Sequence, residues 1–100
     1  MAKIEIQYHP AAAEEVVRAN NWYENIDPNV AQKFKRELDR AERLVSRSPA
    51  AWASYFHGTS GFRFRGFPFV MAYILREESI FVIALAHSRR RPGYWKKRIR

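Results

Sequence analysis

Cysteine is absent from this chain of 100 residues, and histidine occurs only at His9, His57 and His87. The lack of cysteine excludes disulfides and thiolate zinc sites, so a cytoplasmic protein is the simplest expectation. The histidines do not have the spacing of metal ligands, and we therefore expect no metal. We also expect no other cofactor. Long apolar runs are missing as well. The longest, Ile80 to Ala86, suits a strand and is far shorter than the ~18 residues that span a bilayer, so we expect no membrane span.

The chain is rich in apolar and basic residues. Hydrophobic residues make up 47% of it and aromatic residues 15%, so we expect one packed core in a single domain over residues 1–100. Residues 1–86 contain 11 Lys or Arg and 10 Asp or Glu, whereas residues 87–100 contain seven Lys or Arg and no acid. Nearly all of the net charge of +8 thus lies at the C-terminal end. This asymmetry indicates contact with a polyanion, an acidic protein segment or an anionic membrane surface.

The first half of the chain has the pattern of a strand followed by two helices. Apolar and polar residues alternate over residues 4–8, which predicts a strand with one buried face. From Pro10 to Ile26 apolar residues recur every three or four positions, as in an amphipathic helix. Asp27-Pro28 is typical of a new helix start, and the helical spacing then continues to Ser48-Pro49. Because almost nothing joins the two helices, we expect an antiparallel hairpin.

The second half has the pattern of a three-stranded meander. Residues 62–65 alternate again, Phe69 to Leu75 is almost wholly apolar, and Ile80 to Ala86 follows a turn at residues 77–79. The sequence therefore predicts an α+β fold with an N-terminal strand, an antiparallel helical hairpin, a three-stranded antiparallel meander forming one sheet, and a basic C-terminal tail. We expect the N-terminal strand at an edge of the meander or beside its last strand.

This order of elements, together with the segment AHSRRRPGYW at Ala86 to Trp95, resembles the RelE/ParE superfamily of bacterial type II toxins, the plasmid stabilisation proteins. The similarity is sharpest over Phe62 to Trp95. It implies a cytoplasmic toxin with an antitoxin partner, whose acidic or amphipathic segment masks the basic surface, and no membrane partner. It also implies two alternative activities. RelE-like members cleave mRNA on the ribosome, whereas ParE-like members block DNA gyrase and are not nucleases.

The first hypothesis is translation-dependent mRNA cleavage by a metal-independent endoribonuclease. In RelE-like toxins an arginine on the meander, a basic residue after the last strand and a tyrosine further on form the cleavage site. By position the resemblance matches these roles to Arg63 or Arg65, to His87 or Arg89, and to Tyr94. We expect Arg63, His87 and Tyr94 to be the catalytic residues. A histidine can exchange protons near neutral pH, and arginine stabilises a phosphate anion. The other cations are expected to bind RNA phosphates: Arg65, Arg89, Arg90, Arg91, Lys96 and Lys97.

Each of these residues also has a structural interpretation. Arg63 and Arg65 can be the solvated face of an edge strand, His87 a hydrogen-bonded strand cap, and Tyr94 with Trp95 an anchor that folds the tail onto the core. If the tail carries a site, Pro92-Gly93 is expected to turn the chain and bring Tyr94 beside Arg63 and Arg65.

The pattern departs from that of a nuclease in its lack of a suitable carboxylate. After Glu42 the only acidic residues are Glu77 and Glu78, which lie in a predicted turn. The loop before Phe62 also lacks the lysines of several ribosome-dependent members. These departures keep two alternatives open: a gyrase inhibitor, and a basic binding module without toxicity.

Overall fold

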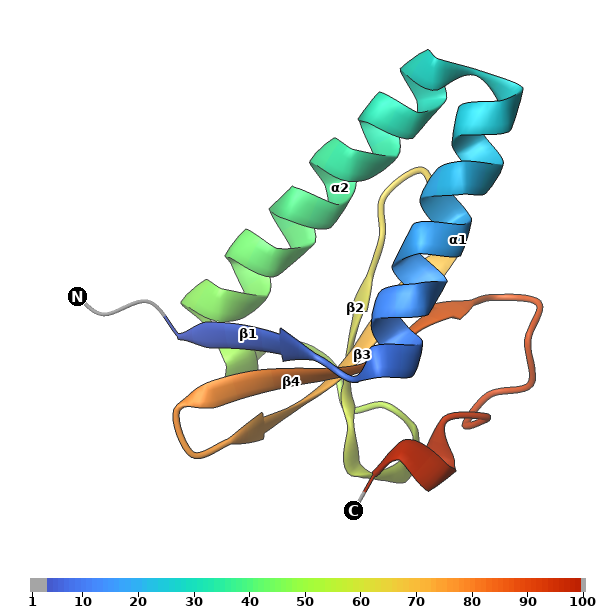
Figure 1. Ribbon diagram of the computed structural model, residues 1–100. Coiled ribbons are helices and arrows are strands. Elements are labelled where there is room, and N and C mark those ends of the chain that lie inside the picture. The colour runs from blue at the N-terminus through green and yellow to red at the C-terminus, as the bar shows by residue number, and fades with distance from the viewer. Residues whose placement is uncertain (1–3, 100) are drawn as a thin grey trace.

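The computed structural model describes residues 4–99 and has the predicted α+β architecture, with a helical hairpin over one face of a four-stranded sheet (Figure 1). No helix among these residues is long and apolar enough to cross a membrane. The principal elements are β1 (Glu5–Tyr8), α1 (Pro10–Ile26), α2 (Pro28–Arg47), β2 (Ser60–Arg63), β3 (Phe69–Arg76) and β4 (Ser79–His87). Short 3-10 turns occupy Pro49–Ala51, Phe56–Gly58 and Lys96–Arg98.

Side-chain caps hold the two helices in a tight hairpin. The Nδ1 atom of His9 accepts a hydrogen bond from the Ala11 N–H at 3.0 Å, so α1 starts directly after β1. Asp27 serves both helices. Its N–H donates to the Tyr23 carbonyl at the end of α1, and its carboxylate accepts from the Asn29 N–H at the start of α2. Because one residue ends the first helix and caps the second, the hairpin has no loop of its own.

The sheet has the order β1-β4-β3-β2. The N-terminal strand β1 pairs in parallel with β4, and the other neighbours are antiparallel, which confirms the expected place of the N-terminal strand at an edge beside the last strand. β1 is short and pairs only with residues 79–82, so it leaves the second half of β4 without a strand partner on that side. A register shift between Ala72 and Tyr73 marks a bulge in the β3–β4 pair.

The second strand differs from its predicted range. It spans Ser60–Arg63 rather than residues 62–65, and its last paired residue, Arg63, lies opposite Val70. The physical reason is a competing hydrogen bond. The backbone N–H of Arg65 donates to the Glu37 carboxylate of α2 at 2.6 Å, so the chain leaves the sheet and passes next to the helix. Arg65 therefore lies outside the strand to which the alternating pattern assigned it.

Apolar residues pack on both faces of the sheet. On one face the helices contribute Phe34 and Val45, among others, to a core with Met71 and Tyr73 of β3. On the other face the C-terminal segment covers Ala84 and its neighbours with Trp95, which is only 1% exposed. Figure 1 shows this arrangement, with the hairpin on one side and the red C-terminal segment on the other. The basic end of the chain is thus anchored to the sheet.

The three tryptophans have different environments. Trp95 stacks on Tyr55 with ring centroids 5.4 Å apart and planes at 12°, which confirms the expected packing of the tail onto the core. Trp52 is half-buried against Phe62. Trp22, by contrast, is 66% exposed on α1, so it does not belong to the core.

Candidate functional site

The basic segment begins at a strand end that is closely hydrogen-bonded. His87 closes β4, and its Nδ1 atom accepts a hydrogen bond from the Arg89 N–H at 3.0 Å. The His87 carbonyl accepts from the Arg90 N–H, and the Ser88 N–H donates to Pro68. The imidazole ring meets Phe69 edge-to-face at 5.2 Å. This geometry agrees with the strand-cap interpretation of His87, and a role in proton transfer stays a prediction.

Side chains, rather than another strand, complete the edge of β4 beyond β1. The last backbone contact from the β1 side is the His9 N–H to the Val82 carbonyl. Further along, the Leu85 N–H donates to Glu15 Oε1 at 3.0 Å, and the Ile83 carbonyl accepts from Arg98 Nη1 at 3.0 Å. Open strand edges expose unpaired donors and acceptors, so these contacts close the sheet where β1 ends.

Glu15 is the centre of this arrangement. Its carboxylate is 9% exposed and also accepts hydrogen bonds from the Tyr94 hydroxyl at 2.6 Å and from both Nη atoms of Arg98 at 2.9 and 3.1 Å. Arg90 Nη1 lies 3.2 Å from the same carboxylate. One helix residue therefore holds three side chains of the C-terminal segment. We call Glu15, Arg90, Tyr94 and Arg98 the Glu15 cluster.

Glu15 was not predicted as a site residue, because a carboxylate was expected on the sheet or late in the chain. The spacing of apolar residues along α1 could have identified it. Glu15 follows Ala12 by three positions and precedes Ala19 by four, and both alanines are buried. A carboxylate on the buried face of a helix requires partners, and the basic C-terminal segment is the obvious source of them.

Tyr94 is held as a hydrogen-bond donor within this cluster. Burial raises the pKa of its hydroxyl well above the ordinary value of 10, and the hydrogen bond to Glu15 and the negative charge of that carboxylate raise it further. The guanidinium groups of Arg90 and Arg98 act in the opposite direction but do not cancel these effects. Arg90 lies over the aromatic ring, 3.7 Å from its centroid.

The predicted meeting of Tyr94 with Arg63 and Arg65 does not occur. Tyr94 lies at the β4 edge beside α1, whereas Arg63 is on β2 at the opposite edge of the sheet. The strand register still brings Arg63 and His87 to the same end of the sheet, because Arg63 pairs with Val70, and Val70 pairs with Ala86. Arg63 is exposed there, in agreement with the solvated-face interpretation.

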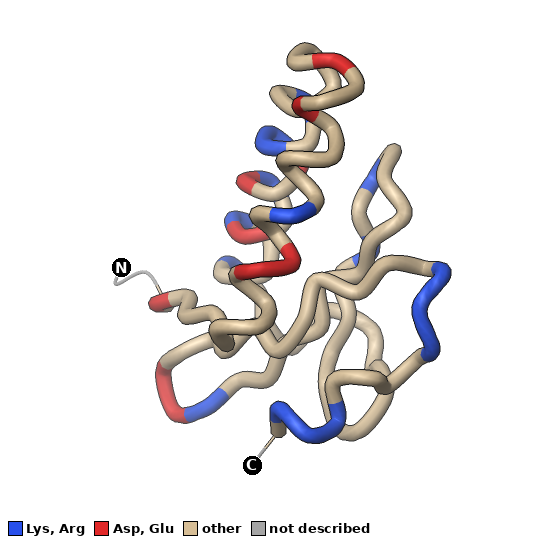
Figure 2. Tube along the Cα trace, turned by 45° about the vertical axis from the view of Figure 1, so that its right-hand side comes forward, with Lys and Arg blue, Asp and Glu red and all other residues tan. Residues whose placement is uncertain are grey.

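The remaining predicted cations belong to separate surfaces. Arg89, Arg91, Lys96 and Lys97 are exposed on the C-terminal segment, together with the partly engaged Arg90. Arg100 lies outside the described residues. Figure 2 shows these positions along the loop after β4 and at the end of the chain, apart from a second series of cations that follows α2.

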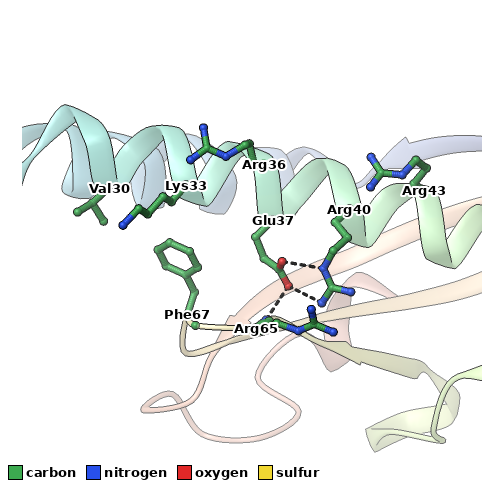
Figure 3. Close-up of a pocket in the computed structure, with 9 residues that line it drawn as sticks. Val30, Lys33, Arg36, Glu37, Arg40, Arg43, Arg65 and Phe67 are labelled. Atoms are coloured by element: carbon green, nitrogen blue, oxygen red, sulfur yellow. Dashed lines mark hydrogen bonds and ion pairs between the residues drawn. The ribbon is translucent and has the colours of Figure 1, made fainter.

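That second series lines an open cleft of about 630 Å³ between α2 and the loop after β2 (Figure 3). We call it the α2 cleft; its lining residues are Val30, Lys33, Arg36, Glu37, Arg40, Arg43, Arg65, Gly66 and Phe67. Burial raises the pKa of Glu37, but hydrogen bonds from Arg40 and the Arg65 N–H outweigh it, so its pKa is lowered overall. The near-zero net charge of residues 1–86 does not reveal these cations, because all the acidic residues that balance them, except Glu37, lie outside the cleft.

Comparison with known proteins identifies the family. A model of the ParE toxin of the type II toxin–antitoxin system parDE matches residues 6–92. The chain belongs to the ParE toxin family. The resemblance to the RelE/ParE superfamily is thereby confirmed, and the ParE branch is the one that matches. No curated protein matches this ParE-family chain by sequence.

A solved structure agrees with the fold of the ParE-family chain. It is described as the chromosomal ParDE TA system from P. aeruginosa, and one of its chains superposes with a TM-score of 0.72 at 12% identity. The match covers 85% of this chain and 96% of that chain. At such low identity the similarity concerns the fold alone, so the roles of individual residues have to be argued from their own contacts.

Proposed function

We propose that this chain is the toxin of a type II toxin–antitoxin pair and that it inhibits growth by binding DNA gyrase without cutting RNA. The observation that carries the proposal is the match of the ParE toxin family model to residues 6–92. The resemblance described above implies gyrase inhibition for ParE-like members and mRNA cleavage for RelE-like members. The family match therefore favours the first activity over the second.

The contacts of the two candidate proton-transfer groups support the same choice. RNA cleavage without a metal needs a base and an acid whose pKa values lie near the working pH. Tyr94 has a strongly raised pKa, and its hydroxyl donates a hydrogen bond to the Glu15 carboxylate. His87 uses Nδ1 to cap the turn that follows β4. Both side chains make contacts that stabilise the fold. Such roles are compatible with a protein that binds its target without catalysing a reaction.

Exposed cations supply a surface for a macromolecular target. Arg89, Arg91, Lys96 and Lys97 are exposed, while the Glu15 cluster fixes the backbone that carries them. Complementary charge raises association rates and selects partners, so an acidic protein face suits this segment. The ParDE description of the similar structure supports a cognate antitoxin as the second partner, one that covers the toxin until it is released.

Two assays on the purified protein test the proposal. We expect it to inhibit supercoiling by DNA gyrase and to leave mRNA intact in a translating extract. Arg89→Glu with Arg91→Glu should weaken inhibition, whereas His87→Ala and Tyr94→Phe should retain it once their folding has been verified. Discrete mRNA cleavage that is abolished by His87→Ala would instead establish the RelE-like activity. Normal growth on induction without an antitoxin, with no effect in either assay, would favour a non-toxic binding module.

A further inference from the structure

The α2 cleft presents a regular row of cations on one wall and a further cation on the other. Lys33, Arg36, Arg40 and Arg43 follow one another at intervals of three, four and three residues, which places them on one face of α2. With a rise of ~1.5 Å per residue, the row extends over roughly 15 Å. Figure 3 shows Arg65 across from Arg40, on the loop that forms the other wall. The row is thus carried by a regular helix and faces a second basic residue.

One carboxylate organises the middle of the cleft without neutralising it. Arg40 Nη2 and the Arg65 backbone N–H donate to the same oxygen of Glu37, Oε2, at 3.0 and 2.6 Å. Arg40 Nε donates to the other oxygen at 2.9 Å. These contacts hold two basic residues close to a single acid. Among the described residues that line the cleft, five are cationic and only Glu37 is acidic, which leaves a net charge of +4.

The types of cation and their exposure favour phosphate as the group that is bound. Four of the five cations are arginines, and a guanidinium group can donate two parallel hydrogen bonds to phosphate oxygens. Lys33, Arg36, Arg43 and Arg65 are exposed, so a ligand can reach them without a rearrangement of the fold. The cleft is therefore an accessible site for an extended anion.

The apolar side chains of the lining, Val30 and Phe67, narrow the choice of ligand. Both are half-buried, and the Phe67 ring packs edge-to-face on Tyr23 at 5.1 Å and on Phe34 at 5.5 Å. Proteins that bind single strands offer open aromatic faces on which bases stack, and protein interfaces have an apolar centre. This lining has neither feature. A duplex, whose bases stack on one another and whose phosphates face outward, suits it better.

We infer that the α2 cleft binds the phosphate backbone of double-stranded DNA. A duplex carries one negative charge per ~1.7 Å of its axis, so a 15 Å length presents roughly nine phosphates to the row. Contacts with phosphates do not read the bases, and binding is therefore independent of sequence. An RNA duplex offers the same phosphodiester groups. The choice of DNA rests on the proposed function, because gyrase acts on DNA, whereas the phosphate chemistry does not depend on it.

The test uses purified full-length protein and three probes. The first is a fluorescently labelled DNA duplex of about 20 base pairs, or two helical turns. The second is a labelled RNA duplex of the same length, and the third is unlabelled polyglutamate, used as a competitor beside unlabelled DNA at equal charge concentration. Fluorescence anisotropy measures the affinity at a series of salt concentrations.

Three variants accompany the wild-type protein. The cleft variant is Arg36→Gln with Arg43→Gln, which leaves the Glu37 contacts intact. The matched control is Arg89→Gln with Arg91→Gln, which makes the same change of charge on the C-terminal segment. Lys35→Gln is a control on α2 itself, because Lys35 is exposed but points ~100° away from its neighbour Arg36 around the helix. Circular dichroism and thermal unfolding verify that the variants are folded.

We expect the wild-type protein to bind the DNA duplex with an affinity that falls steeply as the salt concentration rises. Each phosphate contact contributes about 0.9 to the slope of log K against log salt. The cleft variant should lose about tenfold in affinity at low salt, and its slope should be less steep by about two. The C-terminal control should lose less than about threefold, and Lys35→Gln should keep the wild-type slope.

Four results would overturn the inference. Equal losses in the cleft variant and the C-terminal control would mean that DNA binds the basic surface as a whole, and a larger loss in the control would move the site to the C-terminal segment. Tighter binding of the RNA duplex than of the DNA duplex would make RNA the ligand. Polyglutamate that competes as well as unlabelled DNA would favour an acidic protein. No gyrase is present, so failure here leaves the proposed function untouched.

Discussion

Glu15 of α1 and Arg98 of the C-terminal segment form a two-point ion pair, although 83 residues separate them in the chain. The Arg98 side chain is 16% exposed and that of Glu15 is 9% exposed. Arg98 also donates to the Ile83 carbonyl, so the pair links the first helix, the last strand and the end of the chain. A charge pair that is largely removed from water depends on both partners, because either one alone would be buried without compensation.

Glu15→Gln should therefore destabilise the protein strongly. The amide keeps the shape of the side chain and can still accept the Leu85 N–H, but it leaves Arg98 without its counter-charge. We expect the free energy of unfolding to fall by about 2–4 kcal/mol, as measured by urea denaturation. The matched control is Glu14→Gln. Glu14 pairs with Arg18 on the surface, where the two side chains are 67% and 72% exposed, so the change there should be below about 1 kcal/mol.

A double-mutant cycle separates the pair from its surroundings. If Glu15 and Arg98 stabilise the fold through one another, Glu15→Gln combined with Arg98→Gln should be clearly less destabilising than the sum of the two single changes. Strict additivity would show that the carboxylate acts mainly through Leu85 and Tyr94 instead.

Acid stability should depend on Glu37. Its pKa in the folded state is lowered from the ordinary value of 4.5. Such a group contributes stability that is fully present above the unfolded-state pKa and is lost as the pH falls through the lowered folded-state pKa. The wild-type protein should thus lose unfolding free energy below about pH 4.5, and Glu37→Gln should flatten that part of the profile. Urea denaturation at a series of pH values measures it.

The control for this prediction is Glu24→Gln, an exposed carboxylate at the end of α1. Its acid profile should keep the slope of the wild-type protein. Equal slopes for Glu37→Gln and wild type would mean that the contacts with Arg40 and the Arg65 N–H do not favour the ionised form.

Local patterns were sufficient to predict most of the fold. Alternation and helical spacing placed the helices and the outer strands, which bury one face, and continuous apolar runs placed the two central strands, which are covered on both faces. The boundaries of β2 were wrong because a long-range contact decided them. The Glu37 carboxylate accepts a hydrogen bond from the Arg65 N–H, and no residue near position 65 in the sequence indicates this contact.

The site was harder to predict, since it is built from residues far apart in the chain. The basic segment was evident from composition, and the anchoring of Trp95 followed from its apolar side chain. The partners of that segment were not evident, because Glu15 lies on a helix that precedes it by more than 70 residues. The α2 cleft was hidden for a related reason: a sum of charges over residues 1–86 does not show that the cations share one helix face.

Trp95 should be essential for the second core, whereas Trp22 should not matter for stability. Trp95 is 1% exposed and stacks on Tyr55, so Trp95→Ala removes a large buried ring and should lower the free energy of unfolding by about 3–5 kcal/mol. Trp22 is 66% exposed on α1, and Trp22→Ala should change the free energy of unfolding by less than about 0.5 kcal/mol. Thermal unfolding followed by circular dichroism distinguishes the two. Similar values for both variants would mean that the C-terminal segment does not pack stably on the sheet.

The backbone strain at Gly93, in the turn that begins the packed C-terminal segment, can be compared with that at Gly66, in the loop after β2. Both have a positive φ, 80° at Gly93 and 79° at Gly66, so alanine is strained to a similar extent at either position. They differ in their neighbours. A Cβ atom at Gly93 would lie against the His57 ring, 2.8 Å from its Cδ2 atom, whereas one at Gly66 would meet nothing within 4 Å.

Gly66→Ala should therefore destabilise the protein by about 1 kcal/mol, and Gly93→Ala by about 2 kcal/mol or more, as measured by urea denaturation. The excess at Gly93 comes from the contact with His57. In a His57→Ala background it should disappear, leaving Gly93→Ala close to Gly66→Ala because only the φ strain remains. If the excess persists without the imidazole, the close approach of residues 57 and 93 is not its cause, and the loop at residues 56–58 does not restrict the turn.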